Sequence, residues 1–258
     1  MRRFHLIFLL SFLPVFALGQ TAVTVRGPAG TGGTDAAAAL SLPGTPILQV
    51  DGASLLSIED VEAGSPDGSA RLSKFNGRTI IIPAGGRYAW TQLSKPGVWT
   101  VLALFRQTSL ASAPGVMGGY TTASGGSKTA WGAIRVLATG AAQYQFGDGS
   151  NFSAGQSPAA AISANQWHVV AIVYAGGGAT SAAIYVDGVS VSVTTTATAA
   201  SSTAGTAPTF ACGSIGDANG AGVNTVTMIA ACIAWDEALD ATQVAAATST
   251  VKNAFGLE

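Results

Sequence analysis

The sequence contains little charge. Asp, Glu, Lys and Arg make up 10% of its 258 residues, while 48% are hydrophobic. This composition argues against an intrinsically disordered chain, because such chains combine low hydrophobicity with high charge. The 12 Lys and Arg residues are scattered without forming a basic cluster, and the formal net charge is −1. We therefore expect no nucleic-acid partner and no electrostatic attraction to an anionic membrane.

Side chains that perform catalysis are also scarce. His168 is the one histidine beyond the N-terminal segment, and it lies in the strand-like stretch "WHVVAIV". We interpret it as a sheet-face residue and not as the general base of a Ser-His-Asp triad. One histidine and two cysteines do not indicate a zinc site either. The sequence therefore predicts no catalytic residues and no enzyme.

Paired carboxylates for sugar hydrolysis are not evident among the four glutamates of the chain. A retaining glycosidase needs two carboxylates about 5–5.5 Å apart. The nearest set is Glu59, Asp60 and Glu62 in "IEDVEAG". In a strand, Glu59 and Asp60 would point to opposite faces. A divergent glycanase is therefore only our third hypothesis, after the two given below.

Only the N-terminus carries a longer apolar run. Arg2 and Arg3 precede "LIFLLSFLPVFALG", and small residues follow at the positions that signal peptidase reads. The run is shorter than the roughly 20 residues that a transmembrane helix needs. We expect a signal peptide over residues 1–19 and cleavage before Gln20. The mature protein is then secreted, extracellular or periplasmic, with no membrane span.

Beyond the signal peptide, the composition predicts a flexible Ala/Gly/Thr-rich linker over 20–44 and one domain over 45–258. The domain contains short apolar segments separated by Gly, Pro, Asn and Ser, which is typical of an antiparallel β-sandwich. Asn76-Gly77 and Asp187-Gly188 are typical two-residue hairpin turns. The expected strands are 45–50, 70–75, 78–83, 98–105, 115–120, 130–137, 142–147, 167–175, 209–216 and 226–235, with a hairpin over 181–193.

One helix is expected, at the C-terminus. Asp240 is a suitable N-cap, and Gln243 completes a capping-box pattern three residues later. Gly256 is placed to end the helix. Its apolar face is formed by Val244, Val251 and Phe255. We expect this face to pack on the sandwich and to cover an open edge.

Five stretches, taken in order, resemble the motifs of laminin-G-like, concanavalin-A-like jelly rolls. They are "PILQVDGASLLS", "FNGRTIIIP", "NQWHVVAIVYAGG" with "AAIYVDGVSV", "FACGSIGDANGAG" and "MIAACIAWDEALDATQV". The resemblance covers about Pro43 to Gly256. It implies an all-β, antiparallel jelly-roll sandwich with a short C-terminal helix. This fold hosts lectins, adhesion modules, glycanases and virion fibres, so the resemblance is less informative about function.

Two functions therefore come before a glycanase. The first is an exported, non-catalytic binding module that recognises carbohydrate or a surface protein. The alternative is a structural or adhesion component, such as a virion fibre or decoration domain, which the Ala/Gly/Thr/Ser-rich composition also suits. The oligomeric state and the ligand remain open.

Sugar recognition needs aromatic rings for stacking and a few polar groups to orient hydroxyls. One set of candidates clusters in "GGRYAW", and another falls on strands where it can line one sheet face. The competing interpretation places most of these aromatic residues in the core. The candidate ligand-binding residues are Arg87, Tyr88, Trp90, Trp131, Arg135 and Tyr144, with Gln145 beside the last of them.

Calcium is the one candidate cofactor, and none is required. Members of the family often bind it at the rim through loops rich in oxygen ligands, which the resemblance carries to two loops here. Asp148 and Asn151 lie in "GDGSN", and Asp217 and Asn219 lie in "GDANGAG". The alternative is that these residues only form turns through their side chains.

Two cysteines, Cys212 and Cys232, lie in separate strand-like runs. In an oxidising compartment they can form a disulfide. The alternative is two small buried hydrophobic residues, since spacing alone does not give the register of the strands.

Overall fold

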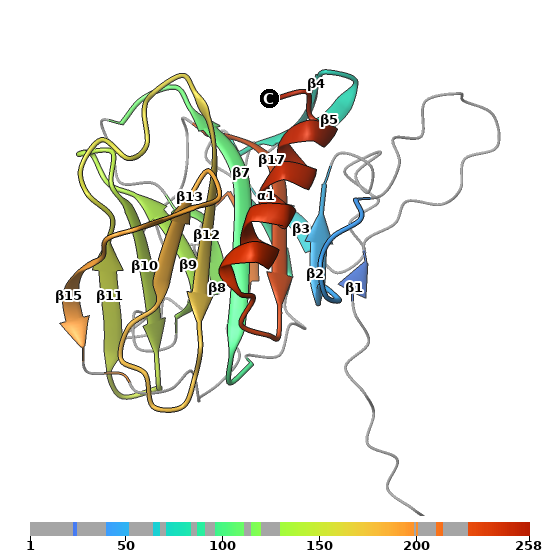
Figure 1. Cartoon of the computed structure of the whole chain (residues 1–258). Coiled ribbons are helices and arrows are strands. Elements are labelled where there is room, and N and C mark those ends of the chain that lie inside the picture. The colour runs from blue at the N-terminus through green and yellow to red at the C-terminus, as the bar shows by residue number, and fades with distance from the viewer. Residues whose placement is uncertain are drawn as a thin grey trace, which may run out of the picture.

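A computed structural model shows two β-sheets and one helix (Figure 1). It describes residues 23–24, 40–51, 64–67, 71–83, 87–90, 96–110, 115–119, 130–198, 200, 210–213 and 227–258. The expected signal peptide lies outside the described residues. Within them, no helix has both the length and the apolar character needed to cross a bilayer.

The first sheet has nine strands, and all of its pairs are antiparallel except β1 with β2. Its order along the main path is β1 (Val23–Thr24), β2 (Leu48–Val50), β17 (Thr227–Trp235), β7 (Trp99–Gln107), β12 (Trp167–Tyr174), β13 (Ala183–Val186) and β14 (Val189–Val191). The remaining strands are β5 (Arg78–Ile82), which pairs with β17, and β4 (Arg71–Phe75), which pairs with β5.

The second sheet has eight antiparallel strands. Their order is β15 (Thr194–Thr198), β11 (Phe152–Gln156), β10 (Ala142–Gly147), β9 (Trp131–Val136), β8 (Gly115–Gly119), β16 (Phe210–Cys212), β6 (Arg87–Trp90) and β3 (Gly64–Asp67). Every strand expected from the sequence is present. The structure adds β1, β3, β6, β11 and β15 to the expected set.

The core lies between the two sheets. Strand β7 is buried on both faces, which explains why its sequence is a continuous apolar run. Trp99, Val101 and Phe105 point into the core between the sheets. Leu102 and Leu104 belong to a second cluster on the other face of the same sheet. A strand buried on both faces needs apolar residues at every position, and "WTVLALF" meets that need.

Helix α1 (Ala241–Ala254) covers this second face. Its capping box is confirmed: Gln243 N donates to Asp240 Oδ1 at 2.8 Å, and Asp240 N donates to Gln243 Oε1 at 2.9 Å. Val244 and Val251 are buried against residues of β7, β12 and β17. The helix therefore packs on the face of the nine-stranded sheet (Figure 1), as expected, and it also contacts β14 at one edge of that sheet.

Both hairpin turns have the predicted geometry. Asn76 and Gly77 have φ of 47° and 78°, and Asp187 and Gly188 have φ of 50° and 82°. Two consecutive positive φ values define a type I′ turn, which Asn-Gly and Asp-Gly favour.

The packed domain begins before residue 45. Leu40 and Leu42 are half-buried against the cluster beneath α1. The carbonyl of Pro43 accepts a hydrogen bond of 2.9 Å from the Trp235 indole. The last residues of the segment expected to be a linker are thus part of the sandwich.

Candidate functional site

The outer face of the eight-stranded sheet carries a row of polar side chains. Backbone register places Arg135 of β9 beside Gln143 of β10, and Gln143 beside Gln156 of β11. Their chain neighbours Ile134 and Tyr144 are in the core, so these three side chains face away from it. All three are half-buried. We call Arg135, Gln143 and Gln156 the polar row.

The polar row presents both donors and acceptors. Arg135 Nη1 donates to Gln143 Oε1 at 3.5 Å, which orients the guanidinium along the sheet. On the next register line, Gln145 stands between Ala133 and Ala154. Both alanines are buried, and Gln145 itself is half-buried. Guanidinium and amide groups in such a row suit hydroxyl and carboxylate groups of a ligand.

Two of the predicted ligand-binding aromatic residues are in the core instead. Trp131 and Tyr144 have no exposed surface. Trp131 packs against Phe210 with ring centroids 4.7 Å apart, and Tyr144 stacks on Phe146 at 5.9 Å. Burial also raises the pKa of the Tyr144 hydroxyl. The expectation that these two rings face a ligand is therefore wrong.

The three candidates in "GGRYAW" form β6 at the other side of the same sheet. Backbone register pairs Tyr88 with Cys212 and Trp90 with Phe210. The side chains of Arg87, Tyr88 and Trp90 lie outside the described part of the chain. Among the predicted ligand-binding residues whose side chains the structure describes, Arg135 is thus the one that faces away from the core.

Asp148 closes the turn between β10 and β11. Its Oδ1 accepts hydrogen bonds from Ser150 N at 2.9 Å and from Asn151 N at 2.7 Å. This is the turn-forming role that we set against calcium binding. Asp217 and Asn219 lie outside the described residues. The part of the chain that is described has no group of three or more His, Cys, Asp or Glu that could hold a metal ion, and calcium remains a prediction.

The two cysteines lie on opposite sheets, Cys212 on β16 and Cys232 on β17. Both are free and fully buried. Burial, together with the neighbouring Cys232 thiol, raises the pKa of Cys212 well above its ordinary value. The side chains therefore meet in the core as two small apolar groups, and a disulfide in an oxidising compartment remains a prediction.

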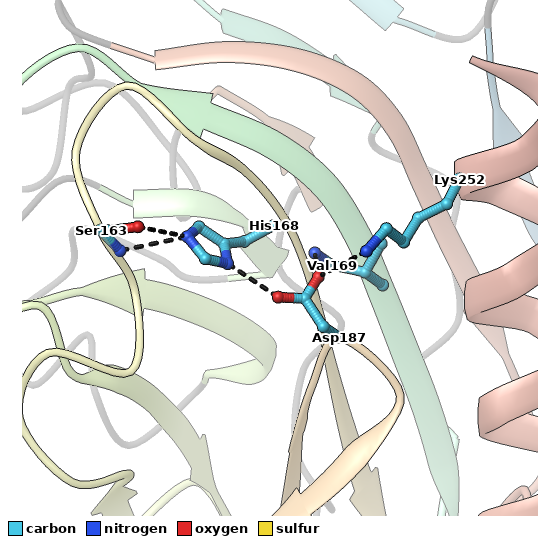
Figure 2. A network of polar contacts seen from close by, with 5 residues as sticks. All are labelled: Ser163, His168, Val169, Asp187 and Lys252. Atoms are coloured by element: carbon cyan, nitrogen blue, oxygen red, sulfur yellow. Dashed lines mark hydrogen bonds and ion pairs between the residues drawn. The ribbon is translucent and has the colours of Figure 1, made fainter. Parts of the chain in front are cut away.

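A second polar cluster lies where β12 begins and the β13–β14 hairpin turns (Figure 2). Ser163 Oγ lies 3.0 Å from His168 Nε2, and His168 Nδ1 lies 2.8 Å from Asp187 Oδ2. Asp187 Oδ1 accepts the backbone N–H of Val169 at 3.0 Å and lies 3.6 Å from Lys252 Nζ of α1. We call Ser163, His168 and Asp187 the serine–histidine–aspartate network.

Hydrogen bonding fixes the tautomer of His168. The backbone N–H of Ser163, which can only donate, points at Nε2 from 3.1 Å. Nε2 is therefore an acceptor, and the ring proton is on Nδ1, directed at Asp187. It follows that the Ser163 hydroxyl donates to Nε2.

Asp187 is held as a carboxylate. Its partial burial raises the pKa, but hydrogen bonds from His168 and Val169 and the positive charge of Lys252 outweigh this effect. The net result is a pKa of Asp187 below its ordinary value. The turn residue thus joins a strand, a hairpin and α1.

Our sequence interpretation gave Asp187 a turn role and His168 a sheet-face role, and it missed their contact. Register was the missing signal. Val170 pairs with Val186, which brings Asp187 next to Val169. Both strands were predicted, but their alignment was not.

Comparison with known proteins agrees with this fold. Residues 84–245 match the laminin-G-type family model described as the concanavalin A-like lectin/glucanases superfamily. The chain belongs to this family. A comparison with curated protein sequences finds no match.

Solved structures give the same architecture at low identity. The binding domain of botulinum neurotoxin serotype D/C has a TM-score of 0.53 and 13% identity over 73% of this chain and 47% of its own. Trypanosoma rangeli sialidase, in complex with a difluoro-nononic acid, has a TM-score of 0.50 and 11% identity. The match covers 74% of this chain and 29% of the sialidase chain. Botulinum neurotoxin type C, whose cell entry depends on two ganglioside molecules, has a TM-score of 0.50 and 12% identity. The match covers 73% of this chain and 46% of the toxin chain. Our chain spans less than half of each, and at these identities the likeness concerns the fold alone.

Proposed function

We propose that this protein is an exported carbohydrate-binding module and that its ligand lies on the polar row of the eight-stranded sheet. The observation that carries the proposal is the alignment of Arg135, Gln143 and Gln156 across three adjacent strands. A rigid sheet holds these groups at fixed spacing, which lowers the entropy cost of binding. Membership of a lectin and glucanase superfamily supports the same function.

The chemistry of the row favours a glycan with an acidic group. The Arg135 guanidinium can form two parallel hydrogen bonds to a carboxylate. Glutamine amides on either side can donate to and accept from sugar hydroxyls. Two structural neighbours, a ganglioside-dependent toxin and a sialidase, make sialylated glycans the first class to test. The function needs no catalytic group.

A glycan array with the full chain tests the proposal, once in calcium and once in EDTA. We expect binding to acidic glycans that Arg135→Ala weakens about tenfold or more, because a hydrogen bond to a charged group contributes about 1.5–3 kcal/mol. The matched control is Arg71→Ala, an exposed arginine of β4 in the other sheet. Loss of binding in EDTA would assign a role to calcium.

Two outcomes count against the proposal. Equal binding by Arg135→Ala and the parent protein would remove the polar row as the site. An absence of binding to every glycan would favour the structural or adhesion alternative, which predicts a stable assembly in size-exclusion chromatography with light scattering.

Export has its own test. The full chain, expressed in a secreting host, is expected outside the cytoplasm with an N-terminus at Gln20, because residues 1–19 have the layout of a signal peptide. N-terminal sequencing of the exported protein measures this. Replacing Leu9 and Leu10 by Arg breaks the apolar run and should retain the protein inside the cell. An intact N-terminus on the exported protein would contradict the prediction.

A further inference from the structure

The serine–histidine–aspartate network has the geometry of a nucleophile, a general base and an orienting carboxylate. Ser163 Oγ to His168 Nε2 is 3.0 Å, and His168 Nδ1 to Asp187 Oδ2 is 2.8 Å. Both distances fall within the range expected of such a relay. Nε2 carries no proton of its own in this tautomer: it accepts the backbone N–H of Ser163 at 3.1 Å and lies 3.0 Å from the Ser163 hydroxyl, so the two donors share its lone pair. Ser163 is exposed, so its hydroxyl is open to a substrate.

Anchors on both sides hold Ser163 in place. The backbone N–H of Ile162 donates to Gly140 O at 2.8 Å, and the Ile162 side chain is fully buried. Two residues after Ser163, Asn165 N donates to Gln107 O at 2.6 Å. The loop thus connects the turn between β9 and β10 to the end of β7. A nucleophile fixed in this way needs little reorganisation before it reacts.

Unpaired polar groups lie beside this network. Phe105 pairs with His168, so Gln107, two residues along β7, is the diagonal neighbour of His168 on the same sheet face. Its side chain is fully buried, and neither amide atom has a hydrogen-bond partner in the described part of the chain. Thr227 pairs with Gln107, and its buried hydroxyl also has no hydrogen-bond partner in the described part of the chain. A buried water, an ion or a ligand can satisfy groups of this kind.

We propose that Ser163 and His168 are catalytic residues that hydrolyse short acyl esters, and that Asp187 positions His168. Ser163 Oγ attacks the ester carbonyl carbon, and its proton passes to His168 Nε2. The ester C–O bond then breaks, and the leaving alkoxide takes the proton from Nε2. Water attacks the acyl group on Ser163 and gives a proton to Nε2. The bond from carbon to Oγ breaks, the acid leaves, and Ser163 regains its proton from Nε2.

The surroundings of Ser163 define the substrate class. Its near neighbours Ala161 and Ala164 are small, and the serine sits at the surface. A short acyl ester that projects from the surface of a larger molecule can reach Ser163 there. This favours O-acetyl esters as substrates. The network and the polar row share no residue, so this activity does not depend on the proposed glycan binding.

The test uses the full chain and two probes, a fluorophosphonate and p-nitrophenyl acetate. The fluorophosphonate should attach to Ser163, as mapped by mass spectrometry of the digest. Ester hydrolysis should fall by about 100-fold or more in Ser163→Ala and in Asp187→Asn, because general-base catalysis contributes about 10²–10⁴-fold. The matched control is Ser190→Ala, an exposed serine of β14.

A purely structural tether would behave differently. It predicts labelling of Ser163 no faster than of Ser190 and ester hydrolysis that survives Ser163→Ala, and either result overturns the proposal. Mapping the label on the unmodified chain keeps the test valid if a variant is unstable, and melting temperatures identify such a variant. Glycan binding by Ser163→Ala, measured on the same sample, separates failure of this site from failure of the polar row.

Discussion

Gln107 shows at the scale of a single residue how a buried polar side chain can weaken a fold. Its amide has no exposed surface and no hydrogen-bond partner among the described residues. An unsatisfied buried group costs about 1–3 kcal/mol. An ordered water, an ion, a ligand or a catalytic role can account for such a group in a native protein.

We therefore predict that Gln107→Met, which keeps the length of the side chain, raises the free energy of unfolding by about 1–3 kcal/mol. Urea denaturation measures this change. If the amide serves a bound ester, the same variant also loses ester hydrolysis. The control is Gln143→Met, where the amide lies half-buried on the outer face and no stabilisation is expected. A loss of stability in Gln107→Met would show that the amide is satisfied in solution.

The hairpin turn at Asp187 acts at the scale of elements, since one carboxylate joins β12, β13 and α1 (Figure 2). Its hydrogen bonds to His168 and to Val169 N–H are the strong contacts, at 2.8 and 3.0 Å. The Lys252 ammonium is farther away, at 3.6 Å, and both side chains of that ion pair are about 30% exposed. Partly exposed ion pairs contribute about 1 kcal/mol or less.

Asp187→Asn should lower the free energy of unfolding at pH 7 by about 1–3 kcal/mol, because an uncharged amide weakens bonds made to a charge. Asn also tolerates the positive φ of this turn. Since folding lowers the pKa of Asp187, the stabilisation is present above the ordinary value of 3.8 and is lost as the pH falls further. Urea titrations at pH 7 and pH 3 measure the difference.

Lys252→Gln is the control, with an expected change below about 1 kcal/mol at pH 7. A difference between Asp187→Asn and the parent protein that stays constant from pH 7 to pH 3 would contradict the assigned role of the carboxylate.

Sequence patterns predicted the strands that bury apolar side chains, such as β7 and β17, and the capped helix α1. They did not predict β11 and β15. β11 is "FSAGQ", which buries only small residues at its centre, and β15 is the largely exposed "TTTAT", so neither strand has the run of large apolar side chains that predicted the others. The same limit applies to the sites. The polar row and the serine–histidine–aspartate network each depend on strand register, and register is set by the whole sandwich.

At the scale of the whole molecule, a cluster of rings joins the two sheets. Trp99 of β7 contacts Trp131 of β9 at 6.5 Å, Phe146 of β10 at 6.2 Å and Tyr174 of β12 at 5.6 Å. Edge-to-face and stacked pairs of this kind add to the free energy gained from burial. The cluster therefore links the packing of one sheet to that of the other.

Trp131→Phe tests both this cluster and the assignment of Trp131 to the core. A smaller ring leaves a cavity and should lower the free energy of unfolding by about 1–3 kcal/mol. The indole N–H of Trp131 has no hydrogen-bond partner among the described residues, so no hydrogen bond is lost. Affinity for glycans should remain unchanged, because the ring does not reach the outer face. Urea denaturation and glycan titration of the same preparation measure the two effects, and a loss of affinity at unchanged stability would return Trp131 to the binding site.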